Sequence, residues 1–147
     1  MLGRAIVAFL ALPGVVAFAL PLAWVALAGL PLRTPAALAI VALGTALLLW
    51  YVREFYVAGK GTLAPWAPPS RLVVTGPYRA SRNPMYMAVL LVLLGWAAAY
   101  RSSGLALYAG GVAIAFHLRV VLAEEPLLAH THGEAWRLYA VRVRRWF

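Results

Sequence analysis

The stretch PMYMAVLLVLLGWAAAYRSSGLALYAGGVAIAFHLRVVLA, residues 84–123, decides the fold of this chain. It contains two apolar runs, from Pro84 to about Tyr100 and from Ser103 to about Ala123, joined by a polar turn at Arg101–Gly104. A helix that crosses a bilayer needs about 20 apolar residues, and about 17 is the lower limit. Both runs meet that limit, the first of them only just. The stretch therefore predicts an antiparallel hairpin of two membrane-spanning helices.

A second pair of apolar runs precedes this hairpin. These runs extend from about Ile6 to Leu30 and from Pro35 to about Tyr51, and the later one continues amphipathically toward Val57. Pro13 and Pro21 lie inside the earlier run, so we expect a kinked or broken helix there. The short connection between the two runs predicts a second hairpin.

Composition places these hairpins in lipid. The 147 residues are 65% hydrophobic and 12% charged, with a mean hydropathy of +0.85. Soluble domains are about 45–50% apolar and about 25% charged. We predict an all-α integral membrane protein with about four transmembrane helices in two hairpins. It should be a single domain, with the first hairpin in residues 1–58 and the motifs in residues 59–147.

Charge predicts how the chain is oriented. Lys and Arg number 13 against four acidic residues, which gives a net charge of +9. Nucleic acid is one partner for such a balance. A bilayer explains it better, because these basic residues sit between apolar runs and such residues collect on the cytoplasmic side. The two short turns hold only Arg33 and Arg101. The opposite side, with both termini and the long middle loop, should be cytoplasmic.

The segment TGPYRASRNPMY, Thr75–Tyr86, is the richest in candidate binding residues. Asn83-Pro84 is typical of a helix N-cap followed by proline at the first helical position. The helix that begins there should offer free N–H groups and a positive dipole end, which suit a carboxylate or a phosphate. Arg82 would add charge beside them. The alternative interpretation is an interfacial anchor for lipid headgroups.

Glu124 and Glu125 form a second candidate site, where the last apolar run ends. Adjacent carboxylates repel each other, so the pair requires either cationic partners or a ligand with a positive centre or hydroxyl donors. Arg119 and the arginines near the C-terminus could be those cationic partners. An interfacial salt-bridge cluster is the alternative. His117 and Arg119 lie within the same run. We expect His117 to be a packed, hydrogen-bonded core residue and Arg119 to reach toward the surface.

Several motifs occur together, in order and at fitting spacing. They are Gly59–Trp66 (GKGTLAPW), Gly76–Arg79 (GPYR), Arg82–Tyr86 (RNPMY), Glu124-Glu125, Gly133, Tyr139 and Arg145-Trp146. The set resembles the isoprenylcysteine carboxyl methyltransferase family and the related phospholipid N-methyltransferases. The resemblance covers residues 59–147, and the first hairpin carries no motif.

The resemblance implies methyl transfer from S-adenosyl-L-methionine to a membrane-embedded or lipid-linked acceptor, with no metal and no nucleic acid. Its cofactor pocket would be cytoplasmic, in a bacterial inner membrane protein, and built from the middle loop and a C-terminal amphipathic helix at about Gly133–Val141. The residues implied to bind the cofactor are Pro77, Tyr78, Arg82, Asn83, Tyr86, Glu124 and Glu125. Glu125, as a base, and Arg145, which would orient the acceptor, are the implied catalytic residues.

The chain departs from the family pattern at some positions. Many members carry His where this chain has Asn83, Tyr where it has Trp136, and Pro where it has Arg144. Asparagine can still hydrogen-bond a carboxylate. Either an isoprenylcysteine-type carboxylate or a lipid amine remains open as the acceptor. Two other interpretations also remain open: an NADPH-binding protein related to membrane sterol reductases, and a non-catalytic membrane protein of the same fold.

Overall fold

The computed structural model of the protein describes residues 10–59 and 71–147, and within them it contains helices and no strand. Residues 60–66 of the quoted GKGTLAPW motif lie outside this described part. The helices are η1 (Leu10–Ala19), α2 (Leu20–Leu27), η2 (Pro35–Ala37), α3 (Leu38–Gly59), η3 (Gly76–Arg79), α4 (Pro84–Tyr100), α5 (Ser103–Arg119), η4 (Val120–Glu124), α6 (Glu125–His132) and α7 (Glu134–Arg142).

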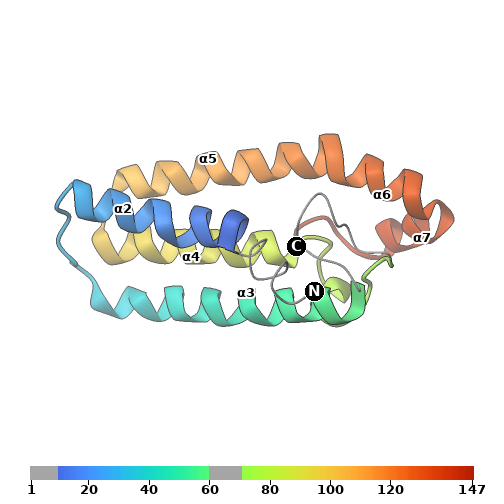
Figure 1. Ribbon diagram of the computed structural model, residues 1–147, viewed down its shortest axis with the longest axis horizontal. Coiled ribbons are helices and arrows are strands. Elements are labelled where there is room, and N and C mark those ends of the chain that lie inside the picture. The colour runs from blue at the N-terminus through green and yellow to red at the C-terminus, as the bar shows by residue number, and fades with distance from the viewer. Residues whose placement is uncertain (1–9, 60–70) are drawn as a thin grey trace.

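Helices α2, α3, α4 and α5 run along the long axis of the molecule, with two short connections at one end (Figure 1). The opposite end holds η3, α6 and α7. In the part of the chain that the structure describes, two helices are long and apolar enough to cross a membrane, Pro35–Ala58 and Ser103–His132. Pro13–Leu27 and Pro84–Tyr100 are shorter apolar helices. The helices are therefore paired in antiparallel fashion, and two of those in the described part are long enough to cross a membrane, where the sequence predicted about four.

The last apolar helix does not end near Ala123 as the sequence suggested. It continues through η4, a π-helical segment at Val120–Glu124, into α6, and reaches His132. Pro126 lies in the first turn of α6. A proline inside a regular helix loses one backbone hydrogen bond and clashes with a preceding carbonyl. The wider winding of a π segment just before it gives the chain room to continue.

The irregularity expected in the first apolar run is confirmed. η1 is π-helical and contains Pro13, whereas Pro21 lies in the first turn of α2, where a missing N–H costs little. Two hydrogen bonds tie η1 to the second hairpin. Trp96 Nε1 donates to the Ala17 carbonyl at 2.9 Å, and Tyr108 Oη donates to the Val16 carbonyl at 2.9 Å.

The core lies where α3 and α4 pack against each other. Gly44 of α3 lies against Val92 of α4, and Gly95 of α4 lies against Val41 of α3. A Cβ at Gly44 would be 2.9 Å from the Val92 nitrogen, and one at Gly95 would be 2.8 Å from the Val41 nitrogen. The two backbones therefore approach more closely than any residue larger than glycine permits.

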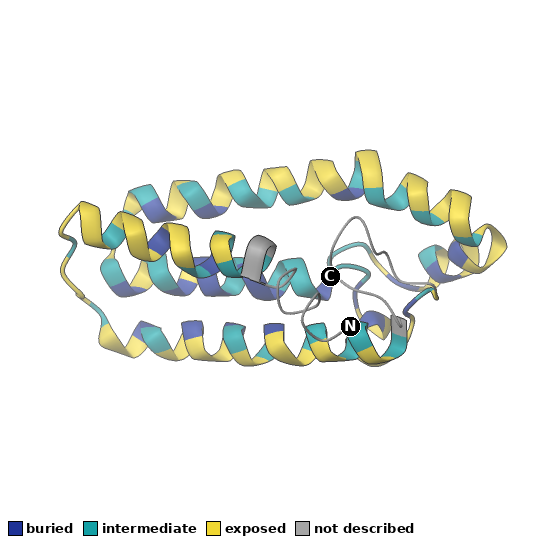
Figure 2. Ribbon diagram, viewed as in Figure 1, coloured by how far each residue is buried: buried dark blue, intermediate teal, exposed yellow. Residues whose placement is uncertain are grey.

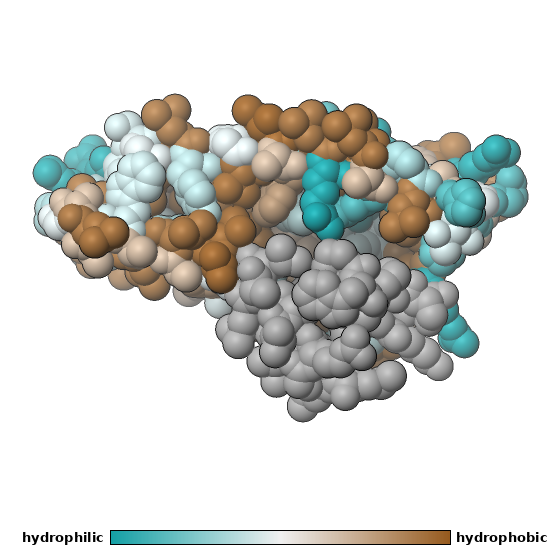
Figure 3. Space-filling model, turned by 45° about the horizontal axis from the view of Figure 1, so that its top comes forward, coloured by the Kyte–Doolittle hydropathy of each residue, from teal (hydrophilic) through white to brown (hydrophobic). Residues whose placement is uncertain are grey.

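Hydrophobic side chains also cover the outside of the helices. Buried residues face the inside of the bundle, and exposed residues line its outer faces (Figure 2). Leu107, Ile114 and Leu122 on the α5–α6 helix are 78%, 65% and 72% exposed. Figure 3 shows hydrophobic side chains over much of the bundle and hydrophilic ones at both of its ends and in a patch between them. Such extended exposed apolar surface is typical of a membrane-facing protein.

Candidate functional site

Three segments that are far apart in the sequence meet at the end of the bundle that carries α6 and α7. They are the start of α4, the η4–α6 junction and the C-terminal segment after α7 (Figure 1). Backbone hydrogen bonding joins the first and the third of them. The Arg82 N–H donates to the Arg144 carbonyl at 2.9 Å, so the chain end returns to the residues just before α4.

Glu125 is the centre of one ion-pair cluster. Arg145 binds it with two parallel hydrogen bonds, from Nε to Oε1 and from the terminal nitrogen Nη2 to Oε2, each of 2.8 Å. Arg82 approaches Glu125 Oε1 to 3.1 Å from the other side. The side chains of Arg82 and Glu125 are only 13% and 16% exposed. Bidentate pairs of this kind are the strong ones, and this pair raises the pKa of Arg145 further above its usual value.

Glu124 forms a second cluster, with partners of its own. Arg119 Nε donates to Glu124 Oε1 at 2.7 Å, and the Tyr86 hydroxyl donates to the same oxygen. Arg119 also donates to the Tyr86 oxygen at 3.2 Å. The Tyr86 ring lies 4.3 Å from the Phe116 ring, which holds it against α5. The two adjacent carboxylates are thus each neutralised by different arginines, as their repulsion required.

Asn83 stands at the N-cap position of α4, as the sequence predicted, but its side chain does not cap the helix. Its Nδ2 donates instead to the Arg145 carbonyl at 3.0 Å. Ser81 Oγ donates to that carbonyl at 3.3 Å and accepts the Asn83 backbone N–H at 3.2 Å. The polar side chains before α4 therefore hold the C-terminal segment in place.

Tyr78 is buried in η3, and its hydroxyl oxygen has no hydrogen-bond partner among the residues that the structure describes. The same holds for the Nε of Arg82. Burial raises the pKa of Tyr78 well above its usual value, so the hydroxyl stays protonated and can donate. Buried polar groups normally have partners. Two unpaired donors beside a charged cluster point to a ligand.

Helix α7 closes this end of the bundle through aromatic contacts. The Tyr139 hydroxyl donates to the Tyr78 carbonyl at 2.7 Å, and burial raises the pKa of Tyr139 to about 12. Trp136, Tyr139 and Val143 form a small buried cluster. The Arg82 guanidinium lies 5.5 Å from the centre of the Trp136 ring. The C-terminal amphipathic helix predicted at 133–141 is present as α7, and it packs on the site.

Most of the predicted site residues are thereby brought together, namely Tyr78, Arg82, Asn83, Tyr86, Glu124, Glu125 and Arg145. Pro77 lies in the same η3 turn, where its carbonyl accepts the N–H groups of Ala80 and Ser81. The expectation for His117 was wrong in one respect. It is exposed rather than packed in the core, and its Nδ1 accepts a hydrogen bond from Trp146 Nε1 at 3.3 Å.

Sequence reasoning missed the roles of Ser81 and Trp136 in this site. Ser81 is an ordinary residue in a polar loop, and no spacing rule indicates that it binds a segment 64 residues away. Trp136 stands where many family members carry tyrosine, but nothing in the sequence places it against Arg82. Arg119, by contrast, was one of the cationic partners expected for the Glu124-Glu125 pair, and in the structure it pairs with Glu124.

A comparison with models of protein families identifies the family of this chain. The family model described as phospholipid methyltransferase matches residues 32–135, which is more than half of the chain. No curated protein and no solved structure matches the chain significantly. The family match, with the two long apolar helices, indicates a membrane methyltransferase and confirms the resemblance that the motifs suggested. The chain belongs to the phospholipid methyltransferase family.

Proposed function

We propose that the protein transfers a methyl group from S-adenosyl-L-methionine to a membrane lipid at the end of the bundle where η3, η4 and the C-terminal segment meet. One observation carries this proposal. Two buried donors, Tyr78 Oη and Arg82 Nε, have no hydrogen-bond partner among the described residues. They lie at the same end of the bundle as the carboxylates of Glu124 and Glu125.

The donor set fits that cofactor. S-adenosyl-L-methionine presents a carboxylate, an ammonium group and ribose hydroxyls. The unpaired Nε of Arg82 suits the carboxylate, the Tyr78 hydroxyl can donate to an acceptor atom, and Glu124 and Glu125 suit the ammonium group or the hydroxyls. When bound, the cofactor supplies an activated methyl group. The residues of the chain would position the acceptor and exclude water.

We propose a phospholipid amine as the acceptor, which agrees with the family description. The carboxylate alternative requires a free arginine, but Arg145 already binds Glu125 through two hydrogen bonds. A carboxylate acceptor would have to open that pair. We therefore assign positioning roles to Glu125 and Arg145. Each fixes the other, and Glu125 also holds Arg82.

Methylation of an amine releases one proton, and we assign Glu124 as the group that accepts it. Arginines stabilise the charged form of Glu125 at both oxygens, which makes it the weaker base, although Oε2 has only one donor and can still accept a hydrogen bond from the cofactor. Glu124 is bound only at Oε1 among the described contacts, so Oε2 remains available. Its side chain is also more exposed than that of Glu125, at 29% against 16%, which gives the proton a shorter route to solvent. The sequence had favoured Glu125 as the base, and the geometry favours its neighbour.

The cofactor proposal is tested by calorimetric titration of the detergent-purified protein with S-adenosyl-L-methionine, and in parallel with NADPH. We expect saturable binding of the first compound only. Tyr78→Phe should weaken the binding of S-adenosyl-L-methionine about two- to twelvefold, which corresponds to one hydrogen bond of about 0.5–1.5 kcal/mol. Because this hydroxyl has no partner among the described residues, the same variant should unfold at a temperature no lower than that of the wild type.

Tyr139→Phe is the matched control for this test. It deletes the same hydroxyl group, but here a 2.7 Å hydrogen bond to the Tyr78 carbonyl is lost. We expect this variant to lower the free energy of unfolding by about 1 kcal/mol. No binding of S-adenosyl-L-methionine at millimolar concentration would overturn the proposed function, and binding of NADPH alone would point to the reductase alternative.

We also propose that the site faces the cytoplasm. Arg33 and Arg101 lie at the loop end, whereas the arginines of both ion-pair clusters lie at the other. The chain has no cysteine, so single cysteines can be introduced without background. In intact cells a membrane-impermeant maleimide should label Ser103→Cys and leave Glu134→Cys unlabelled until the cells are opened. The reverse pattern would invert the orientation.

A further inference from the structure

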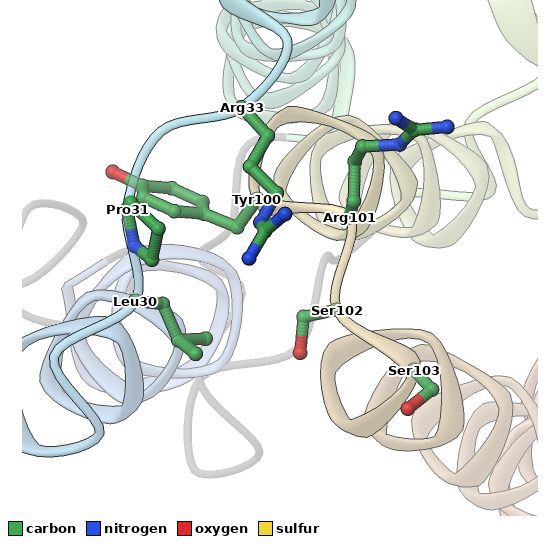
Figure 4. A pocket seen from close by; sticks show the side chains of 7 residues that line it. All are labelled: Leu30, Pro31, Arg33, Tyr100, Arg101, Ser102 and Ser103. Carbon is green, nitrogen blue, oxygen red and sulfur yellow. The ribbon is translucent and has the colours of Figure 1, made fainter.

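We infer that the loop end of the bundle, opposite the proposed methyl-transfer site, holds a binding site for the phosphate of a phospholipid headgroup. A hollow of about 490 Å³ opens there between the connection Leu30–Arg33 and the turn Tyr100–Ser103. Its lining combines two arginines, a tyrosine and two serines with Leu30 and Pro31 (Figure 4). This inference is independent of the methyl-transfer chemistry.

The two arginines of this hollow have no acidic partner. The chain contains only four acidic residues. Each of them pairs with another arginine: Glu54 with Arg53, Glu124 with Arg119, Glu125 with Arg82 and Arg145, and Glu134 with Arg137. No side-chain carboxylate therefore neutralises Arg33 or Arg101. At the edge of a bilayer, the anion that fulfils this role is a lipid phosphate.

The backbone fixes Arg33 at the rim of the hollow. The N–H groups of Arg33 and Thr34 donate to the Ala99 carbonyl at 3.0 and 2.9 Å, which ties the first connection to the end of α4. Figure 4 shows the Arg33 guanidinium turned into the space between Leu30 and Ser102, whereas the Arg101 side chain points away from it. Arg33 is therefore the residue to which we assign the phosphate contact.

An apolar hollow at the same end favours a lipid over a free anion. It measures about 390 Å³ and is lined by Trp24, Leu27 and Ala28. Trp24 also packs on the start of α5, because a Cβ at Gly104 would lie 2.7 Å from its ring. The apolar surface at the end of α2 thus adjoins the turn that carries Ser102 and Ser103. A phosphate attached to a glycerol and acyl chains could contact both hollows, whereas inorganic phosphate could contact only one.

The experiment titrates the full chain in nonionic detergent with phosphatidylglycerol and follows bound lipid by native mass spectrometry. A diacylglycerol with the same acyl chains, which lacks the phosphate, is titrated in parallel. We expect Arg33→Gln to weaken binding of the first phosphatidylglycerol molecule to the protein about fivefold. One cation at the membrane surface contributes about 1 kcal/mol, which corresponds to that factor. The diacylglycerol should bind more weakly than phosphatidylglycerol to the wild type, and Arg33→Gln should not change its binding.

Arg137→Gln is the matched control, because it removes the same charge from an arginine with a side chain that is 79% exposed at the other end of the molecule. It should leave phosphatidylglycerol affinity within about twofold of the wild type. If both variants lost the same affinity for phosphatidylglycerol, the effect would come from the overall charge of the protein, and the proposed site at Arg33 would be wrong. Inorganic phosphate is added at about 50 mM, enough to fill a weak anion site with a Kd of about 10⁻³–10⁻² M. If it displaced the phosphatidylglycerol completely, the assignment to a lipid would be overturned.

Discussion

Replacing Glu125 with glutamine is expected to lower the free energy of unfolding by about 3 kcal/mol, the size expected when one partner is removed from a mostly buried ion pair. The variant keeps the shape of the side chain but removes its charge. Arg82, 13% exposed, and Arg145 would then face each other without a carboxylate between them. In thermal unfolding, this loss corresponds to a decrease of roughly 6–12 °C for a chain of this length.

Cofactor binding should be affected as well. Glu125 fixes Arg82, whose unpaired Nε we assign to the cofactor carboxylate. A guanidinium released from its partner would be less well positioned, so we expect the Kd for S-adenosyl-L-methionine to rise at least tenfold, or about 1.4 kcal/mol. Calorimetry at a temperature well below the lowered midpoint separates this effect from unfolding.

Glu134→Gln is the control for this prediction. Glu134 pairs with Arg137 at 3.8 Å, and both side chains are more than 70% exposed. Exposed pairs of this kind contribute about 0–1 kcal/mol, so neither stability nor cofactor binding should change measurably. If Glu125→Gln behaved like Glu134→Gln, the Glu125 cluster would not organise the site, and the proposed positioning roles would be wrong.

Features of this structure that depend on neighbouring residues could be predicted from the sequence, whereas features that depend on contacts between distant residues could not. The apolar runs fix the helices because their length and composition are local properties, and Pro13 and Pro21 mark where the first helix is irregular. The end of the last helix was placed near Ala123 because the apolar run stops there, whereas the helix continues past Pro126. Whether a π-helical segment precedes it depends on the packing of Val120 and the anchoring of Glu124.

The residues of the candidate site could also be predicted from the sequence, but the ion pairs that they form with one another could not. Two adjacent carboxylates required cations, and the sequence offered several. Which arginine takes which carboxylate depends on how the C-terminal segment folds back onto the residues before α4, through Ser81, Asn83 and the backbone of Arg82. No local rule encodes that return, because the partners are separated by more than 60 residues.

The contact between α3 and α4 gives the second large expected effect. Gly95→Ala should destabilise the protein by about 2 kcal/mol, within the range for overpacking a well-packed core. The added methyl group would meet the Val41 nitrogen at 2.8 Å and the Val41 side chain at 2.7 Å. A side chain could rotate away, but a helix backbone cannot, so the two helices must separate. Thermal or denaturant unfolding in detergent measures the loss.

Gly111→Ala on α5 is the matched control, because apart from its own stretch of helix no described residue has an atom within 4 Å of a Cβ placed there. Alanine is the better helix former by about 1 kcal/mol, so this variant should be neutral or slightly more stable. Equal destabilisation by Gly95→Ala and Gly111→Ala would mean that close approach of α3 and α4 is not what glycine provides at position 95.

The double variant Gly44→Ala/Gly95→Ala tests the same contact more sharply. The two glycines lie on opposite sides of one interface, Gly44 against Val92 and Gly95 against Val41. Once the helices have separated to accept one methyl group, the second meets less resistance. We therefore expect a combined loss of about 3 kcal/mol, below the sum of the single losses, with a coupling energy within the range of about 0.5–3 kcal/mol seen for residues in contact. Strict additivity would show that each site relaxes by itself, and the helix pair would then be less rigid than its close packing implies.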